Sequence, residues 1–273
     1  MKRCFFLLLL ALAFALPARA DERPSAPPAA KADARPAAPA SPLTPDERFA
    51  KAIEQFTKGG SDYDGAGYGE AVFQLREIAA AGAWSHGALH NLGNAEWKVS
   101  RPGYAVLAWE RARTLNPFDR NTIANLHFAR VKAQLVEPDR RWYEQYSEWL
   151  PPAAWLLGAG VSLWGGIILL CLPRLLVWRR AGWHQGVAAL LLATFLLAVP
   201  ALLGLWSRSN LGVVLEDETR LRLTPTRDGE ELGKLAAGEV ARVEDTRGSY
   251  LYVRAENDRA GWVDQRDFAK VWP

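Results

Sequence analysis

Apolar residues in the first half of the chain recur at the spacing of amphipathic helices. The first such helix begins at Thr44, whose hydroxyl can cap it, and Pro45, whose fixed φ suits a first turn. One face of this helix carries large apolar side chains: Phe49, Ile53 and Phe56. The glycines at 59–60 are predicted to end it, and a glycine-rich connection through Gly69 to precede a second helix over residues 70–81.

The same arrangement returns after about 34 residues, which indicates stacked helical hairpins. A segment containing Asn91-Leu92 is followed at fixed offsets by four marker positions: Ala105, Trp109, Ala112 and Pro117. Asn125-Leu126 then repeats Asn91-Leu92. This third unit is predicted to hold one helix, from Asn121 to about Val136, with no clear second helix after it. We therefore predict an all-α repeat region over residues 45–137, with two to three units.

Two uncharged runs follow, at residues 153–172 and 186–206, and each has the length of about 20 residues that spans a bilayer. Tryptophans stand at or near their ends, as interface anchors do: Trp149, Trp155, Trp178, Trp183 and Trp206. An aromatic juxtamembrane segment over residues 138–152 precedes the first run. Two buried helices of a soluble protein are the alternative, but two such runs in tandem favour a membrane hairpin. Neither run contains an Asp, Glu, Lys or Arg, so the hairpin is predicted to be an anchor rather than a transport path.

Charges near the hairpin predict its orientation. The loop over residues 173–185 carries Arg174, Arg179 and Arg180, which places it in the cytoplasm and both flanks outside. Residues 1–20 have the basic start, apolar run and small-residue end of a secretory signal peptide, which predicts the same side for the repeats. An uncleaved anchor is the alternative for these residues. Residues 21–44 are rich in Ala and Pro and are predicted to be an extended linker.

From residue 211 the pattern changes to short alternating apolar stretches separated by turn residues. The stretches are Val213-Val214-Leu215, 221–225, 233–243, 250–254 and 261–263. They predict a small all-β barrel over residues 211–273. Tyr250 and Trp262 are candidates for an aromatic ligand surface, although Trp262 also suits the core of such a barrel.

Composition excludes several classes of function. The net charge of +3 is small for a nucleic-acid-binding protein. Cys4 and Cys171 lie in apolar runs and cannot form a disulfide framework or a metal cluster. His86 and His90 stand at i and i+4, but the sequence shows no third metal ligand near them. We find no nucleophile–base pattern and no phosphate-binding glycine loop, and the acidic residues of the C-terminal region are expected to be solvated. The chain is therefore predicted to be non-enzymatic, without a cofactor.

The segment from about Ser85 to Pro117 closely resembles a tetratricopeptide repeat, although Pro102-Gly103 departs from the family's turn. The resemblance implies a protein-binding groove lined by the first helix of each unit. The implied groove residues are His90, Asn91, Asn94, Asn121 and Asn125. Some family members clamp a partner's terminal carboxylate there; Asn94 and Asn125 fit that scheme, but His90 stands in place of a Lys. The alternative is that these amides support helix packing or face water.

Residues 211–273 resemble a bacterial SH3 domain, with matching positions at Arg222, Pro225, Leu235, Gly238 and Gly261-Trp262-Val263, and with Tyr250 in place of a common tryptophan. As a whole the chain resembles the BatE-type proteins of bacterial aerotolerance operons. That resemblance implies a scaffold in the bacterial inner membrane, with repeats and SH3 domain in the periplasm and with envelope proteins, including von Willebrand A-domain proteins, as partners. A peptidoglycan-binding anchor is the main alternative. A sensor ranks last because the short loop offers no cytoplasmic output domain.

Overall fold

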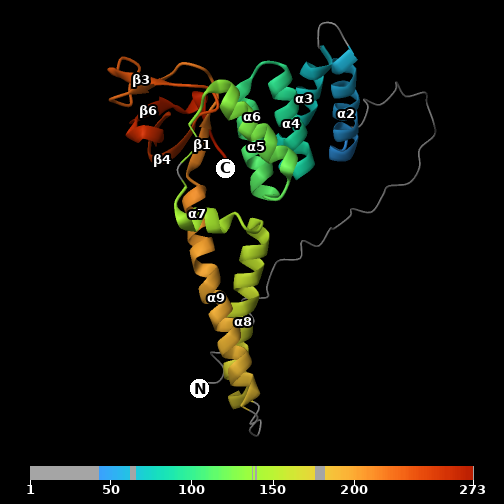
Figure 1. Ribbon diagram of the computed structural model, residues 1–273, viewed down its shortest axis with the longest axis vertical. Coiled ribbons are helices and arrows are strands. Elements are labelled where there is room, and N and C mark those ends of the chain that lie inside the picture. Colours follow the sequence, from blue (N-terminus) through green and yellow to red (C-terminus); the bar gives the residue numbers. More distant parts are fainter. Residues whose placement is uncertain (1–42, 62–65, 137, 139, 176–181, 273) are drawn as a thin grey trace, which may run out of the picture. The chain divides into compact units, whose positions relative to one another are not determined.

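The computed structural model describes residues 43–61, 66–136, 138, 140–175 and 182–272. The predicted signal peptide, nearly all of the predicted linker and residues 176–181 of the predicted cytoplasmic loop lie outside these residues. Within the described ranges, eight helices are followed by an antiparallel sheet of seven strands (Figure 1). The fold class is thus confirmed at the level of a mostly helical chain with a C-terminal antiparallel sheet and two long apolar helices.

The first five described helices pack each against the next along the chain. They are α2 (Pro45–Ser61), α3 (Ala66–Ala80), α4 (His86–Lys98), α5 (Pro102–Leu115) and α6 (Arg120–Ala133). Side chains cap two of them: Ser85 Oγ accepts from Ala88 N at the start of α4, and Asp119 accepts from Thr122 N at the start of α6. Gln134, in the left-handed region, ends α6 earlier than the predicted Val136.

The glycines between α2 and α3 do not form the long connection that the sequence predicts. The first helix continues through Gly59-Gly60 to Ser61, and the second begins at Ala66, so Gly67 and Gly69 are helical. A Cβ on Gly67 would lie 2.4 Å from Gln55 O. Gly67 therefore allows α2 and α3 to approach closely, although its place in a glycine-rich stretch predicts a connecting segment.

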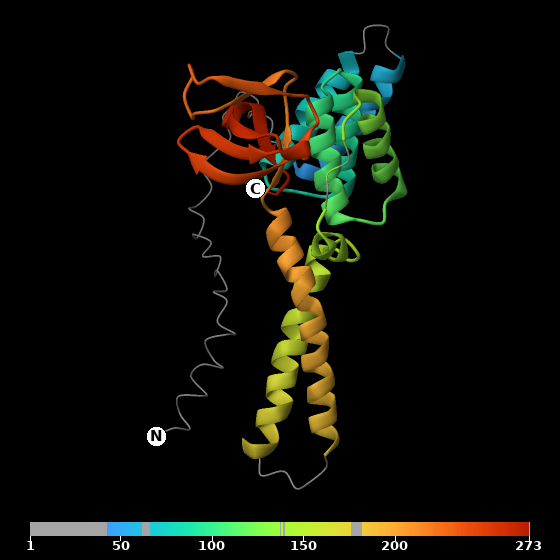
Figure 2. The same cartoon turned by 60° about the vertical axis from the view of Figure 1, so that its left-hand side comes forward.

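Two longer helices follow a short one. α7 (Trp142–Ser147) lies in the predicted juxtamembrane segment, and α8 (Pro152–Leu175) and α9 (Trp183–Arg208) contain the two uncharged runs. α8 and α9 lie side by side in both views (Figures 1 and 2). Both are long and apolar enough to cross a membrane, and most of their residues are not buried. Trp149, Trp183 and Trp206 are exposed near their ends.

The sheet has the strand order β3-β2-β6-β5-β4-β1-β7, with every pair antiparallel. Its strands are β1 (Leu211–Val214), β2 (Thr219–Arg222), β3 (Glu231–Leu235), β4 (Val240–Arg247), β5 (Tyr250–Arg254), β6 (Ala260–Asp264) and β7 (Phe268–Lys270). The apolar stretch 233–243 contains two strands, because a turn with Gly238 at φ +88° separates β3 from β4.

The sheet packs directly on α5. Val213 shares a buried cluster with Val106 and Trp109, whereas its neighbour Val214 belongs to the core within the sheet. Because successive side chains of a strand point to opposite faces, β1 is covered on both. Arg111 of α5 donates from Nε and Nη2 to the carbonyl oxygens of Val271 (3.1 Å) and Lys270 (2.9 Å). The repeats and the sheet, treated as separate domains from sequence, thus share a core.

Candidate functional site

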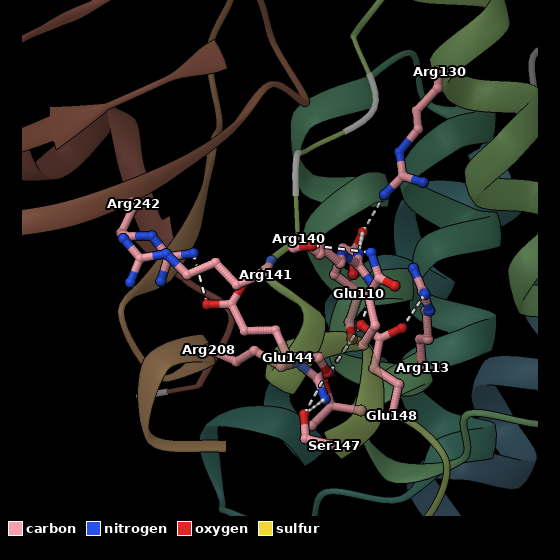
Figure 3. Close-up of polar contacts among 12 residues, drawn as sticks. Glu110, Arg113, Arg130, Arg140, Arg141, Glu144, Ser147, Glu148, Arg208 and Arg242 are labelled. Carbon is pink, nitrogen blue, oxygen red and sulfur yellow. Dashed lines mark hydrogen bonds and ion pairs between the residues drawn. The ribbon is translucent and has the colours of Figure 1, made fainter. Parts of the chain in front are cut away.

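A cluster of buried charges lies where α5, α6, α7, α9 and β4 meet (Figure 3), and we call it the junction. Glu144 of α7 is 0% exposed. Its Oε1 accepts from Arg242 Nη2 at 2.8 Å and from Ser207 Oγ at 2.5 Å. Its Oε2 accepts from the backbone N–H of Arg141 at 3.1 Å. These contacts satisfy a carboxylate that would otherwise be costly to bury.

Glu148, one turn further along, holds the other side of the junction. Arg113 Nη2 of α5 donates to Glu148 Oε2 at 2.6 Å, and Arg140 pairs with Glu148 Oε1. Arg208, the last residue of α9, lies 3.8 Å from the same Oε1 atom. Glu148 therefore connects the repeat helices to the end of the second apolar helix.

Glu110 extends the junction into α6. Arg130 Nη2 donates to Glu110 Oε1 at 2.5 Å, and Arg140 Nη2 reaches the same oxygen at 3.5 Å. Burial alone would raise the pKa of Glu110, but Arg140 and the other guanidinium groups outweigh it and hold this pKa below its ordinary value. The carboxyl is therefore charged at neutral pH and attracts the arginines around it.

Sequence reasoning missed the junction. Glu144 and Glu148 looked like ordinary polar positions in an aromatic segment. The available signal was their i, i+4 spacing directly after Arg140-Arg141, which puts both carboxylates on one face of a helix. Arg242, the partner of Glu144, lies 98 residues away from it, and no local pattern shows that pairing.

The predicted groove residues Asn94 and Asn125 meet, and they hold the helices together. Asn94 Oδ1 accepts from Asn125 Nδ2 at 2.8 Å and from Trp109 Nε1 at 3.2 Å. Gly93 permits this arrangement, since a Cβ there would lie 2.4 Å from Trp109 Nε1. These bonds join α4, α5 and α6, and they match the packing alternative of the sequence analysis.

The predicted groove residue His90 lies beside His86 and Thr122. His90 Nδ1 is 2.8 Å from Thr122 Oγ1, and His86 Nε2 is 3.3 Å from the same hydroxyl. Asp119 Oδ2 lies 3.2 Å from His86 Nε2. The expectation that no third metal ligand lies near the two histidines is therefore wrong, because the cap of the next helix brings Asp119 to them. Burial lowers the pKa of His90, with Asp119 opposing the shift.

The remaining groove candidates differ in exposure. Asn91 is half-buried on α4, and Asn121 is exposed at the start of α6. Of the five predicted residues, the structure thus pairs Asn94 with Asn125 and places His90 in a histidine cluster, and it shows neither contact for Asn91 and Asn121 among the described residues.

The outward face of α6 carries apolar side chains, and we call it the α6 stripe: Ile123, Phe128 and Val131. Val131 is 65% exposed. At about 100° per residue these positions fall within one side of the helix, opposite the buried Leu126 and Ala129. A cavity of about 280 Å³ lies beside the stripe and is lined by Ile123 and by junction residues Arg113 and Arg130.

In the sheet, the two aromatic candidates have different surroundings. Trp262 is 7% exposed and packs edge-on against Tyr252, with ring centroids 5.3 Å apart. Tyr250 is half-buried and lines a cavity of about 370 Å³ together with Ser249, Asp264 and Arg266. The expected solvation of the acidic residues is wrong at Glu239, which is buried and paired with Arg259. Burial raises the pKa of Glu239.

Searches of protein-family models, curated proteins and solved structures found no match to this chain. The class of protein that the fold defines is a mostly helical chain with a C-terminal antiparallel sheet and two membrane-length helices.

Proposed function

We propose that this protein is a non-enzymatic scaffold, anchored in the bacterial inner membrane by α8 and α9, that binds other envelope proteins. Its repeats are of the tetratricopeptide type and its sheet is an SH3-like barrel, in the arrangement of the BatE-type proteins. The observation that carries the proposal is the α6 stripe, an exposed apolar helix face at the end of the helical stack. In a repeat array, such a face packs against the next helix.

The junction supports this role because it fixes the binding surface relative to the bilayer. Ion pairs join α5 to Glu148 at the end of α7, Glu148 to the end of α9, and α7 to the sheet. A rigid connection reduces the entropy lost when a partner binds at the membrane surface. We propose an amphipathic helix of an envelope protein as the partner element, since its apolar face would complete the third repeat unit.

The test is site-specific photo-crosslinking in membranes. A crosslinker at Val131 is expected to capture one membrane protein, whereas a crosslinker at Lys132, about 100° around the helix, captures less of it. Val131→Glu should prevent co-purification of that protein, and Lys132→Glu should leave it unchanged. Equal capture from both positions, with both variants retaining the protein, would refute the stripe as the binding face.

The topology is part of the proposal. The repeats and the sheet lie in the periplasm, and the loop that contains Arg179 lies in the cytoplasm. A cysteine substituted at Arg179 should then resist an impermeant thiol reagent in intact cells, while one at the exposed Asn121 reacts. Labelling at position 179 in intact cells would overturn this orientation.

A peptidoglycan-binding anchor is the second candidate, and the polar cavity beside Tyr250 favours it. If the sheet binds the cell wall, the full chain in detergent should sediment with purified sacculi, and Tyr250→Ala should weaken this. Binding that is strong and sensitive to Tyr250 would favour the anchor. The absence of sedimentation would leave the scaffold as the better explanation.

A further inference from the structure

Four polar atoms from two neighbouring repeat units converge at one end of the groove. His86 Nε2 and His90 Nδ1 come from α4, and Asp119 Oδ2 and Thr122 Oγ1 come from the start of α6. Asp119 Oδ2 lies 3.2 Å from His86 Nε2 and 3.7 Å from His90 Nδ1. The ligand atoms of the two histidines and the aspartate all lie within 4.8 Å of one another.

These separations match those between the ligands of one transition-metal ion. Zinc bonds of about 2.0–2.2 Å in a tetrahedron place neighbouring ligand atoms about 3.4 Å apart. Asp119 Oδ2 is close to this spacing from both histidine nitrogens, at 3.2 Å and 3.7 Å. Thr122 Oγ1 is closer, 2.8 Å from His90 Nδ1 and 2.6 Å from Asp119 Oδ2, and is hydrogen-bonded to them, so an ion would displace this hydroxyl.

We propose that His86, His90 and Asp119 form a binding site for a divalent transition-metal ion, and that Zn²⁺ is its occupant. Two imidazoles and one carboxylate suit Zn²⁺, whereas Ca²⁺ and Mg²⁺ prefer all-oxygen ligands. A water molecule completes the tetrahedron. This site is independent of the scaffold proposal, since it needs neither a partner nor the α6 stripe.

The surroundings of the site suit metal entry and metal binding. The side chains of His86, His90 and Asp119 are 27%, 17% and 19% exposed, so an ion can reach them from solvent. Thr122 N and Thr122 Oγ1 both donate to Asp119 Oδ2, at 2.9 Å and 2.6 Å, and these bonds hold the carboxylate beside the two imidazoles.

A bound ion would link α4 to α6 across a repeat boundary. Short arrays have a small hydrophobic core, and a metal that binds the folded state more tightly than the unfolded state raises the midpoint of thermal unfolding. A structural role for Zn²⁺ in the groove follows from this position. The simpler alternative is a hydrogen-bonded cap, in which the Thr122 hydroxyl donates to Asp119 and accepts from a histidine N–H.

The test uses the full chain in detergent, stripped of metal with a chelator and then titrated with Zn²⁺ by calorimetry. Co²⁺ serves as a spectroscopic substitute, because four-coordinate Co²⁺ absorbs strongly in the visible range. We expect about one Zn²⁺ per chain, a four-coordinate Co²⁺ spectrum, and a rise in the thermal midpoint with Zn²⁺. His90→Ala should weaken Zn²⁺ binding by about tenfold or more.

Asp119→Asn is the variant that preserves the fold, since Asn caps helices as well as Asp does. It should also lose about tenfold in Zn²⁺ affinity and the Co²⁺ spectrum, while its circular dichroism stays that of the wild type. His127→Ala, at an exposed position on α6 outside the cluster, is the control and should bind as the wild type does. Equal Zn²⁺ affinity in all four proteins, or a loss confined to His127→Ala, would overturn the proposal.

Discussion

The junction and the groove both hold polar side chains between helices, but they differ in charge, burial and reach. The junction uses buried carboxylates and arginines, and one of its pairs, Glu144 with Arg242, joins residues 98 positions apart. The predicted groove residues Asn94 and Asn125 are neutral amides of α4 and α6, 31 positions apart. The comparison shows that the charged pair Glu144–Arg242 fixes distant segments to one another, whereas the amide pair joins helices that are close in sequence.

The largest effect is expected at the junction. Glu144→Ala leaves Arg242 without its buried partner, and this should lower the free energy of unfolding by about 3–5 kcal/mol. Glu244→Ala is the matched control, since Glu244 and Arg254 form an exposed pair and should contribute at most about 1 kcal/mol. Urea unfolding of the detergent-solubilised protein measures both. Equal losses would remove the distinction between buried and exposed pairs.

The second effect tests how closely the groove helices approach. A Cβ at position 93 would collide with Trp109, so Gly93→Ala should destabilise the protein by about 1–3 kcal/mol. At Gly69, also helical, an added Cβ would meet no described atom within 4 Å apart from the backbone of its own helix and its chain neighbours. Gly69→Ala should therefore stabilise by about 0.5–1 kcal/mol. The same unfolding measurement applies, and a neutral Gly93→Ala would show that Trp109 can move.

The third prediction distinguishes a packing role of the predicted groove amides from a role in binding a partner. Asn94→Ala removes the acceptor for Trp109 and Asn125, which should cost about 1 kcal/mol of stability. Asn121→Ala, at an exposed position, should change stability by less than about 0.5 kcal/mol. An Asn94→Ala protein with unchanged stability but without its crosslinked partner would instead assign Asn94 to binding.

The smallest effect is a pH dependence of stability that arises from Glu96 of α4. This carboxyl is buried, and its Oε1 lies 2.6 Å from Arg76 Nε. Burial raises its pKa, with Arg76 opposing, so protonation favours the folded state. Relative to Glu96→Gln, the wild type should be most stable below the unfolded pKa of about 4.3 and lose this advantage as the pH rises through the folded pKa.

Unfolding free energies of the wild type and Glu96→Gln between about pH 4 and pH 7 measure this slope. Glu54→Gln provides the control, because Lys58 lowers the pKa of the exposed Glu54. The wild type should be more stable than Glu54→Gln at neutral pH and should lose this difference as the pH falls. This change has the opposite sign to the one expected at Glu96. Slopes of the same sign for both variants would contradict the assignment of burial as the cause at Glu96.

The sequence by itself determined the order and type of the elements. Helical spacing located α4 and α5, two uncharged runs located α8 and α9, and alternation located five apolar stretches of the sheet. One of these stretches holds both β3 and β4, and β7 was not predicted. These signals are local, since each depends on residues within one element. Local reasoning failed at Gly67, where the glycine serves a helix contact rather than a turn.

Only the tertiary structure decided which elements touch. The run Val213-Val214 predicts a buried strand, but not that α5 covers one face of it. The same holds for Asp119, which reads as a helix cap in sequence and becomes a neighbour of His86 only when α4 and α6 pack. Contacts across tens of residues depend on the packing of whole elements, and a pattern within one element does not contain that information.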